Sequence, residues 1–254
     1  MYHLGMRAVG IAIIGSTIVA CGSFGTTSPE TPSPPEDSGS TIDASTAVDA
    51  SPSSIPGLVA HWPLDESAGT QALDLGPTKS NGTLVGAQDW RPGRIGNAFR
   101  FNGTTHFNVP YRGELAPSDA FTFAAWLNPE ATTYNQRLYA RGFAWHVKLE
   151  GSNRRPALGS GALLAVTLGE GVPLGTWTHV AITFNRGAIQ FFVNGVFAPS
   201  ESHFPANTPM KDPLTGDTKL GASGNEADKA LGLIDDVRLY DRVLTADEVA
   251  SLAK

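Results

Sequence analysis

Residues 177–195 constrain the fold of this chain more than any other stretch. Apolar side chains alternate with smaller or polar ones over residues 180–184 and again over 189–193, which is the period of a β-strand with one buried face. Residues 185–187 separate the two runs, and an Asn-Gly pair that suits a type I′ turn closes the second one. The stretch therefore predicts a β-hairpin. Because such a hairpin is only marginally stable alone, we expect a second sheet to cover its apolar face.

Residues 121–129 are apolar at both odd and even positions. A strand with this pattern is covered on both faces, so we expect it at the centre of a sheet, with Trp126 in the core. The 28 glycines and 18 prolines among the 254 residues agree with many strands joined by turns. The single cysteine excludes an internal disulfide. The net charge of −6 argues against nucleic acid as a partner.

Four further motifs follow one another along the chain, at residues 57–66, 74–84, 96–103 and 232–249. The first reads Gly-Leu-Val-Ala-His-Trp-Pro-Leu-Asp-Glu, and the second is a loop that begins with Asp and ends in Gly-Thr-Leu. The third reads Gly-Asn-Ala-Phe-Arg-Phe-Asn-Gly, and the fourth contains Ile-Asp-Asp-Val-Arg-Leu-Tyr. With the hairpin, they resemble the LamG-like jellyroll domains of the concanavalin A-like lectin/glucanase superfamily. The resemblance implies an all-β fold over 57–254, a two-sheet antiparallel jelly-roll sandwich with one short C-terminal helix. A Thr-Ala-Asp-Glu capping box at 245–248 predicts where that helix begins.

The N-terminal region reads as an export signal followed by a tether. An apolar run over residues 8–20 is too short to span a bilayer, which takes about 20 apolar residues, and has the length of a signal-peptide core. The residues Ile-Val-Ala before Cys21 resemble a bacterial lipobox. This resemblance implies that residues 1–21 are a lipoprotein signal peptide and that Cys21 is the lipidated residue. The alternative is an ordinary signal peptide with a chance cysteine. Residues 22–56 are acidic and rich in Ser, Thr and Pro, which predicts a disordered tether. We expect a lipid-anchored protein of the bacterial cell envelope, at the outer membrane or cell surface.

The sequence predicts no catalytic residues. Laminarinase-type members of the superfamily carry Glu-x-Asp-x-x-Glu on one strand, which places the carboxylates on one face. Here Glu-x-Asp occurs once, at Glu226 and Asp228, in a Gly-rich loop, and Leu231 stands where the second glutamate belongs. No Gly-x-Ser-x-Gly motif or paired histidine spacing occurs, and we expect His179 to be a packed strand residue.

The resemblance also implies a possible calcium ion, since related domains often hold one with oxygen ligands from several loops. The candidate ligands are Glu66, Asp74 and Asp235, although Lys79 in the same loop as Asp74 argues against the ion. Alternation places Asp235 in one row with the apolar residues of its strand, where a carboxylate must be paired, hydrogen-bonded or metal-bound. Asp236 shares the other row with an arginine, which predicts a salt bridge.

Arg141, Trp145 and His146 are the candidate ligand-binding residues, because an aromatic face and polar groups meet there in a segment where the family varies. The function predicted first is a non-catalytic binding module for a polysaccharide or for an envelope or extracellular protein. A structural envelope component without a specific sugar ligand is the second hypothesis, and a glycoside-active enzyme on the same fold is the third. Fold alone does not decide among them.

Overall fold

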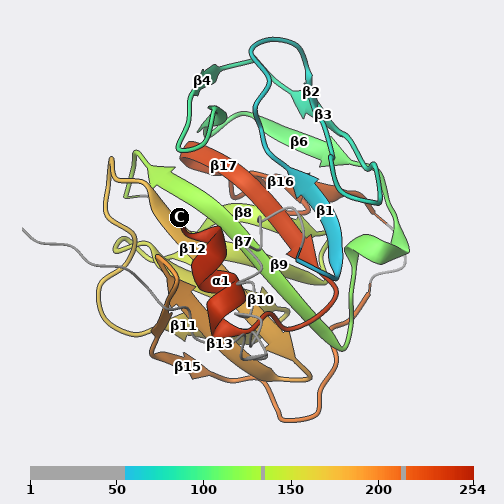
Figure 1. Ribbon diagram of the computed structural model, residues 1–254, viewed down its shortest axis with the longest axis vertical. Helices are drawn as coiled ribbons and strands as arrows, with labels where there is room; N and C mark the ends of the chain where they lie inside the picture. The colour runs from blue at the N-terminus through green and yellow to red at the C-terminus, as the bar shows by residue number, and fades with distance from the viewer. Residues whose placement is uncertain (1–54, 133–134, 213–215) are drawn as a thin grey trace, which may run out of the picture. The chain divides into compact units, whose positions relative to one another are not determined.

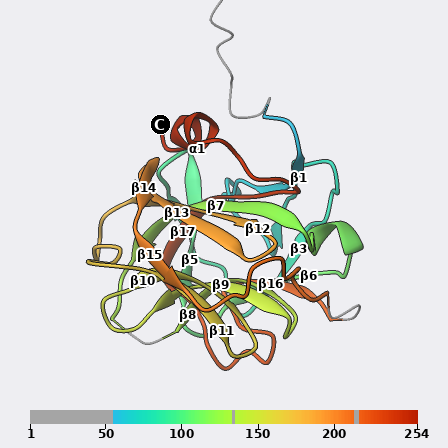
Figure 2. The same ribbon diagram turned by 90° about the horizontal axis from the view of Figure 1, so that it is seen from below.

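Two antiparallel β-sheets pack face to face in the computed structural model, which describes residues 55–132, 135–212 and 216–254 (Figures 1 and 2). The predicted signal peptide with Cys21, and the predicted tether up to residue 54, lie outside the described residues. The two layers and the short helix at the C-terminus confirm the predicted all-β sandwich.

The first sheet has eight strands. In order across the sheet, seven of them are β14 (Val196–Ala198), β13 (Ala188–Val193), β12 (Thr178–Asn185), β7 (Ala120–Pro129), β17 (Leu231–Tyr240), β5 (Asn97–Asn102) and β4 (Trp90–Pro92). The eighth, β1 (Leu58–Trp62), pairs with β17, so the first and last strands of the domain are neighbours. The predicted hairpin is confirmed as β12 and β13, and the doubly apolar stretch is confirmed as β7, between β12 and β17.

The second sheet has nine strands. In order they are β15 (Ser200–Ser202), β11 (Leu163–Thr167), β10 (Arg155–Ser160), β9 (Trp145–Glu150), β8 (Gln136–Arg141), β16 (Thr218–Leu220), β6 (His106–Val109), β3 (Gly82–Val85) and β2 (Gln71–Ala72). Strands β8 to β11 run consecutively as a meander, and a 3₁₀ turn, η2 (Gly113–Leu115), lies between β6 and β7. The meander carries the candidate site described below.

The main core fills the space between the sheets and is rich in aromatic rings. Phe99, Phe101 and Phe107 meet edge to face, with ring centroids between 4.7 and 6.0 Å apart. Such offset contacts suit the quadrupoles of aromatic rings better than direct stacking. Residues from both sheets contribute to this cluster, which holds the two layers together.

Helix α1 (Ala246–Leu252) covers the outer face of the first sheet (Figure 2). The Thr245 hydroxyl accepts from the Glu248 backbone N–H at 3.3 Å, and the Glu248 carboxylate accepts from the Thr245 N–H at 2.8 Å, which confirms the predicted capping box. Val249 and Leu252 are buried against the sheet, together with Ile55. No helix in the described ranges has the length and apolar character needed to cross a membrane.

A β-bulge in β17 corrects one prediction. The pairing of β17 with β7 shifts between Asp235 and Arg238, and Asp236 has a φ of 51°. As a result Ile234 and Val237 both reach the core between the sheets, so Asp235 does not share a row with Val237. Within the bulge, Asp236 forms the predicted salt bridge with Arg238 at 2.9 Å. The extra residue of the bulge changes the phase of the alternation, which a strict period of two cannot predict.

Candidate functional site

The β8–β9 hairpin, where the sequence placed the ligand site, turns its predicted aromatic residue inward. Trp145 is 1% exposed, and its ring stacks between Phe121, at 4.6 Å between centroids, and Tyr139, at 5.1 Å. Its neighbours in the same row, Val147 and Leu149, belong to the core as well. Trp145 therefore offers no ring face to a ligand, which corrects the prediction of an exposed platform at this position.

Arg141, the last residue of β8, is also fully buried. Its guanidinium donates to the Gly216 carbonyl at 2.7 Å and to Asp212 Oδ1 at 3.1 Å, and lies 4.4 Å from the centroid of the Tyr111 ring. These contacts join β8 to two loops. They give Arg141 a structural role, and its predicted ligand contact stays a prediction that no observation tests.

His146 points to the opposite side of the sheet from Trp145, because successive strand residues alternate between faces. The ring lies against Gly159 of β10, where a Cβ atom would come within 2.3 Å of His146 Nε2. Burial, with Arg137 and Lys148 nearby, lowers the pKa of His146 to about 3, so the ring is neutral at physiological pH. Within the part of the chain that the structure describes, neither ring nitrogen is hydrogen-bonded to protein. A neutral imidazole offers one donor and one acceptor to a ligand.

His146 lines a pocket of about 230 Å³ on the outer face of the second sheet, which we call the polar pocket. Its walls come from β8, β9, the turn between them, the turn after β10 and the loop before β17. The lining residues are Arg137, Ala140, Gly142, Phe143, His146, Gly161, Ser223, Gly224, Asn225, Ala227 and Asp228.

Phe143 is the exposed aromatic residue of this pocket. It lies in the tight turn between β8 and β9 and is 77% exposed, two positions before the buried Trp145. The sequence prediction singled out this hairpin through Trp145 and did not name Phe143, the ring that faces solvent. The available signal was the preceding Gly142, which marks a turn, where a large side chain has no facing sheet to pack against.

The loop that forms the far wall of the polar pocket is held to the sheet by ion pairs. Arg137 Nη2 lies 3.1 Å from Asp228 Oδ2, and Lys219 Nζ lies 3.0 Å from Glu226 Oε1. Ala222 and Lys229 pair as an isolated β-bridge at the base of this loop. Both carboxylates of the Glu-x-Asp sequence are therefore engaged by cations of the neighbouring sheet, and they lie in a loop instead of on a strand.

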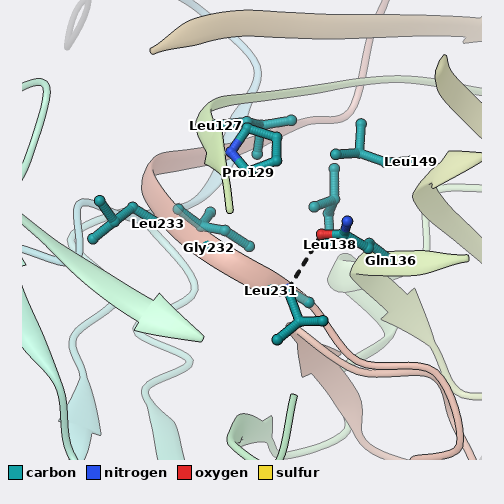
Figure 3. Close-up of a pocket in the computed structure, with 10 residues that line it drawn as sticks. Leu127, Pro129, Gln136, Leu138, Leu149, Leu231, Gly232 and Leu233 are labelled. Carbon is teal, nitrogen blue, oxygen red and sulfur yellow. Dashed lines mark hydrogen bonds between the residues drawn. The ribbon is translucent and has the colours of Figure 1, made fainter. Parts of the chain in front are cut away.

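A second, much smaller pocket opens between the sheets and is lined mainly by leucines (Figure 3). The Gln136 side chain accepts a hydrogen bond from the Leu231 N–H at 3.2 Å across it. Its volume of about 10 Å³ leaves room for no more than one water molecule. We therefore treat it as a packing gap of the core.

The predicted calcium ligand Asp74 is fully used by the protein. Its carboxylate is 2% exposed and accepts four hydrogen bonds, from the backbone N–H groups of His61, Gly76 and Ser80 and from the Thr78 hydroxyl, at 2.6–2.8 Å. A carboxylate with four donors has no lone pair left for a metal. Asp74 therefore holds its loop against β1 through these hydrogen bonds and does not fit a calcium site.

Asp235 retains a free oxygen. Its Oδ2 accepts from the backbone N–H groups of Arg94 and Ile95 at 2.8 and 2.9 Å, whereas its Oδ1 is buried without a hydrogen-bond partner among the described residues. Burial raises the pKa of Asp235 to about 7, and the negative charges of Asp236 and Asp65 add to this effect. The Oδ1 atom of Asp65 accepts from the Asn97 N–H of the same turn at 2.7 Å.

Glu66, the third predicted calcium ligand, accepts from the Leu73 N–H at 2.7 Å, and its second oxygen is buried without a partner in the described ranges. No three His, Cys, Asp or Glu side chains in those ranges form a group that could hold a metal. The structure therefore does not bring Glu66, Asp74 and Asp235 together as one metal centre.

The fold is a two-sheet antiparallel β-sandwich, and the comparison with known families agrees with this fold. Residues 101–250 match the family described as the concanavalin A-like lectin/glucanases superfamily. Because the match covers more than half of the 254 residues, the chain belongs to this superfamily. The predicted membership is thereby confirmed.

Several solved structures share the fold. Domain 4 of AbnA, a GH43 extracellular arabinanase from Geobacillus stearothermophilus solved in complex with arabinotriose, is similar over 78% of this chain and 98% of that domain, with 26% identity and a TM-score of 0.62. The binding domain of Paraclostridial Mosquitocidal Protein 1 is similar over 78% of this chain and 52% of its own, with 17% identity and a TM-score of 0.56. Trypanosoma rangeli sialidase matches over 78% of this chain and 33% of its own, with 20% identity and a TM-score of 0.56. At such identities the last two show a shared fold only.

Proposed function

We propose that this domain binds the sugar units of a polysaccharide in the polar pocket and releases them unchanged. The observation that carries the proposal is the exposed Phe143 ring beside His146, Asn225 and the Arg137–Asp228 pair in one pocket. A sugar has apolar C–H faces and hydroxyl-rich edges. An aromatic ring next to a few fixed polar groups matches both surfaces at once.

The neutral state of His146 strengthens this proposal. A sugar hydroxyl both donates and accepts hydrogen bonds, and a neutral imidazole does the same through its two nitrogens. An imidazolium would only donate. Because the pKa of His146 is about 3, we expect glycan affinity to stay constant between pH 5 and pH 8.

The surroundings of the two loop carboxylates support binding without cleavage. Glycoside hydrolysis uses two carboxyl groups that flank the scissile bond, one of them free to exchange a proton. Here the Asp228 carboxylate is paired with Arg137 and the Glu226 carboxylate with Lys219. The hydrolase hypothesis therefore has little support from this pocket.

The cellular setting proposed from the sequence is a lipid anchor at Cys21 and a tether that presents the domain at the cell envelope. A binding module benefits from such presentation because its ligand is captured at the surface. A protein ligand remains the alternative that the binding experiment separates from a glycan.

The test is isothermal titration calorimetry of the full-length protein with arabinotriose and a panel of trisaccharides, since arabinotriose accompanies the similar arabinanase domain. Phe143→Ala should weaken binding by roughly 10–30-fold, because losing ~60–80 Å² of buried apolar contact at ~25 cal/mol/Å² costs ~2 kcal/mol.

Phe197→Ala is the matched control, because Phe197 is 54% exposed on β14 of the other sheet. We expect this variant to bind like the wild type. Equal affinity of wild type and Phe143→Ala for the best glycan, or binding by no member of the panel, would contradict the proposed function.

A further inference from the structure

We propose that the glycan lies across Phe143 and fills a second pocket beyond it, so that the domain recognises an internal segment of a sugar chain. This inference rests on the proposed function. Its starting point is a cavity of about 290 Å³ on the other side of the β8–β9 turn, which we call the apolar pocket. Its walls include the side chains of Leu163, Phe204 and Met210.

Two residues, Phe143 and Gly161, line both pockets. Phe143 projects from its turn into solvent, and Gly161 lies in the turn between β10 and β11. A Cβ atom built on Gly161 would meet no atom within 4 Å. The two pockets therefore adjoin at Phe143 and Gly161, and we infer that a ligand in one pocket continues into the other.

The sizes of the cavities favour a chain of at least two sugar units. Small-molecule sites typically measure ~300–1,000 Å³. The polar pocket and the apolar pocket each fall just below that range, whereas together they lie within it. A site for a chain end needs one closed pocket, while two pockets that communicate suit a chain that continues in both directions.

The two pockets also differ in chemistry, so we assign a different part of the ligand to each pocket. The polar pocket offers His146 and Asn225 as hydrogen-bonding groups for hydroxyls. The apolar pocket offers mostly hydrocarbon walls, which suit the C–H face of the neighbouring unit. The Phe143 ring lies between these positions and contacts both units.

The test is a chain-length series on the full-length protein, using arabinose oligosaccharides from two to six units or the series that binds best in the panel. Gly161→Asn places a side chain in the passage between the pockets. Asparagine tolerates the left-handed backbone, and Gly161 has a φ of +59°. Gly175→Asn is the matched control, because Gly175 has a φ of +65°, also has open space around its Cβ position, and lines neither pocket.

For the wild type and Gly175→Asn, affinity should rise by roughly tenfold or more from two units to the longest oligosaccharide. Gly161→Asn should lose that rise, so that its affinities for the disaccharide and for the longest oligosaccharide lie within about threefold of each other. A rise that persists in Gly161→Asn, or a wild-type affinity independent of chain length, would overturn the two-pocket inference. In both cases the proposed function survives, because the wild type still binds glycan through Phe143.

A second measurement needs no variant and therefore does not depend on folding. Chemical reduction opens the sugar ring at the reducing end of an oligosaccharide. If the protein holds an internal segment, reduced and unreduced six-unit chains should bind equally well. A loss of affinity on reduction would show that the chain end is recognised.

Discussion

Replacing Trp145 with alanine separates the core role of this residue from the binding role that its sequence position suggests. The indole is 1% exposed and has a ring stacked on each side, Phe121 at 4.6 Å and Tyr139 at 5.1 Å. Truncation removes both contacts and leaves a cavity between the two sheets. Backbone sheets on either side cannot collapse into such a space, so little of the loss is recovered.

The expected loss of stability follows from these contacts. A buried Trp→Ala change costs about 3–5 kcal/mol, of which the two ring pairs contribute ~1–3 kcal/mol. In a domain of this size each kcal/mol lowers the melting temperature by about 2–4 °C, so we expect a decrease of roughly 10 °C. Phe143→Ala should change the melting temperature by less than about 2 °C, because an exposed side chain loses few contacts.

The assay is thermal and urea unfolding of the full-length protein, followed by near-UV and far-UV circular dichroism. The wild type, Trp145→Ala and Phe143→Ala are compared under the same conditions. If Trp145→Ala lost less than about 1 kcal/mol, the ring would not be packed between the sheets, and the assignment of the exposed platform to Phe143 would fail with it.

Two further predictions concern Asp235 and the anchor. The free energy of unfolding should fall by ~1.4 kcal/mol for each unit that the pH rises from 5 to 7, and level off above pH 7. The reason is that the pKa of Asp235 is about 7 in the folded chain and ~3.9 in the unfolded one, so the folded state holds the proton more tightly. Asp235→Asn should flatten this slope, and an unchanged slope in the variant would refute the assignment. Cys21→Ser should move the protein out of the membrane fraction or halt its processing, since the lipid is the proposed attachment, and a variant that fractionates like the wild type would disprove the anchor.

The sandwich leaves its two sheets with different outer faces. The outer face of the first sheet is partly covered by α1, with Val249 and Leu252 packed on it. The outer face of the second sheet carries the polar pocket. The proposed ligand site and the helix therefore lie on different sheets.

The strands of this protein were predictable from local pattern. The alternation over residues 180–193 and the doubly apolar run at 121–129 predicted β12, β13 and β7, because a period of two is a property of neighbouring residues. The capping box at Thr245 was equally local, since both of its hydrogen bonds span three residues.

The tertiary structure decided which side chains are available to a ligand or a metal. The sequence analysis grouped Trp145 with His146, although neighbouring strand residues point to opposite faces, and only the opposing sheet determined that Trp145 is the buried one. The oxygen atoms of Asp74 accept from donors that include His61, 13 positions away, and the Oδ2 atom of Asp235 accepts from a turn about 140 positions away. Such contacts join segments that the fold brings together, so no local pattern in the sequence reports them.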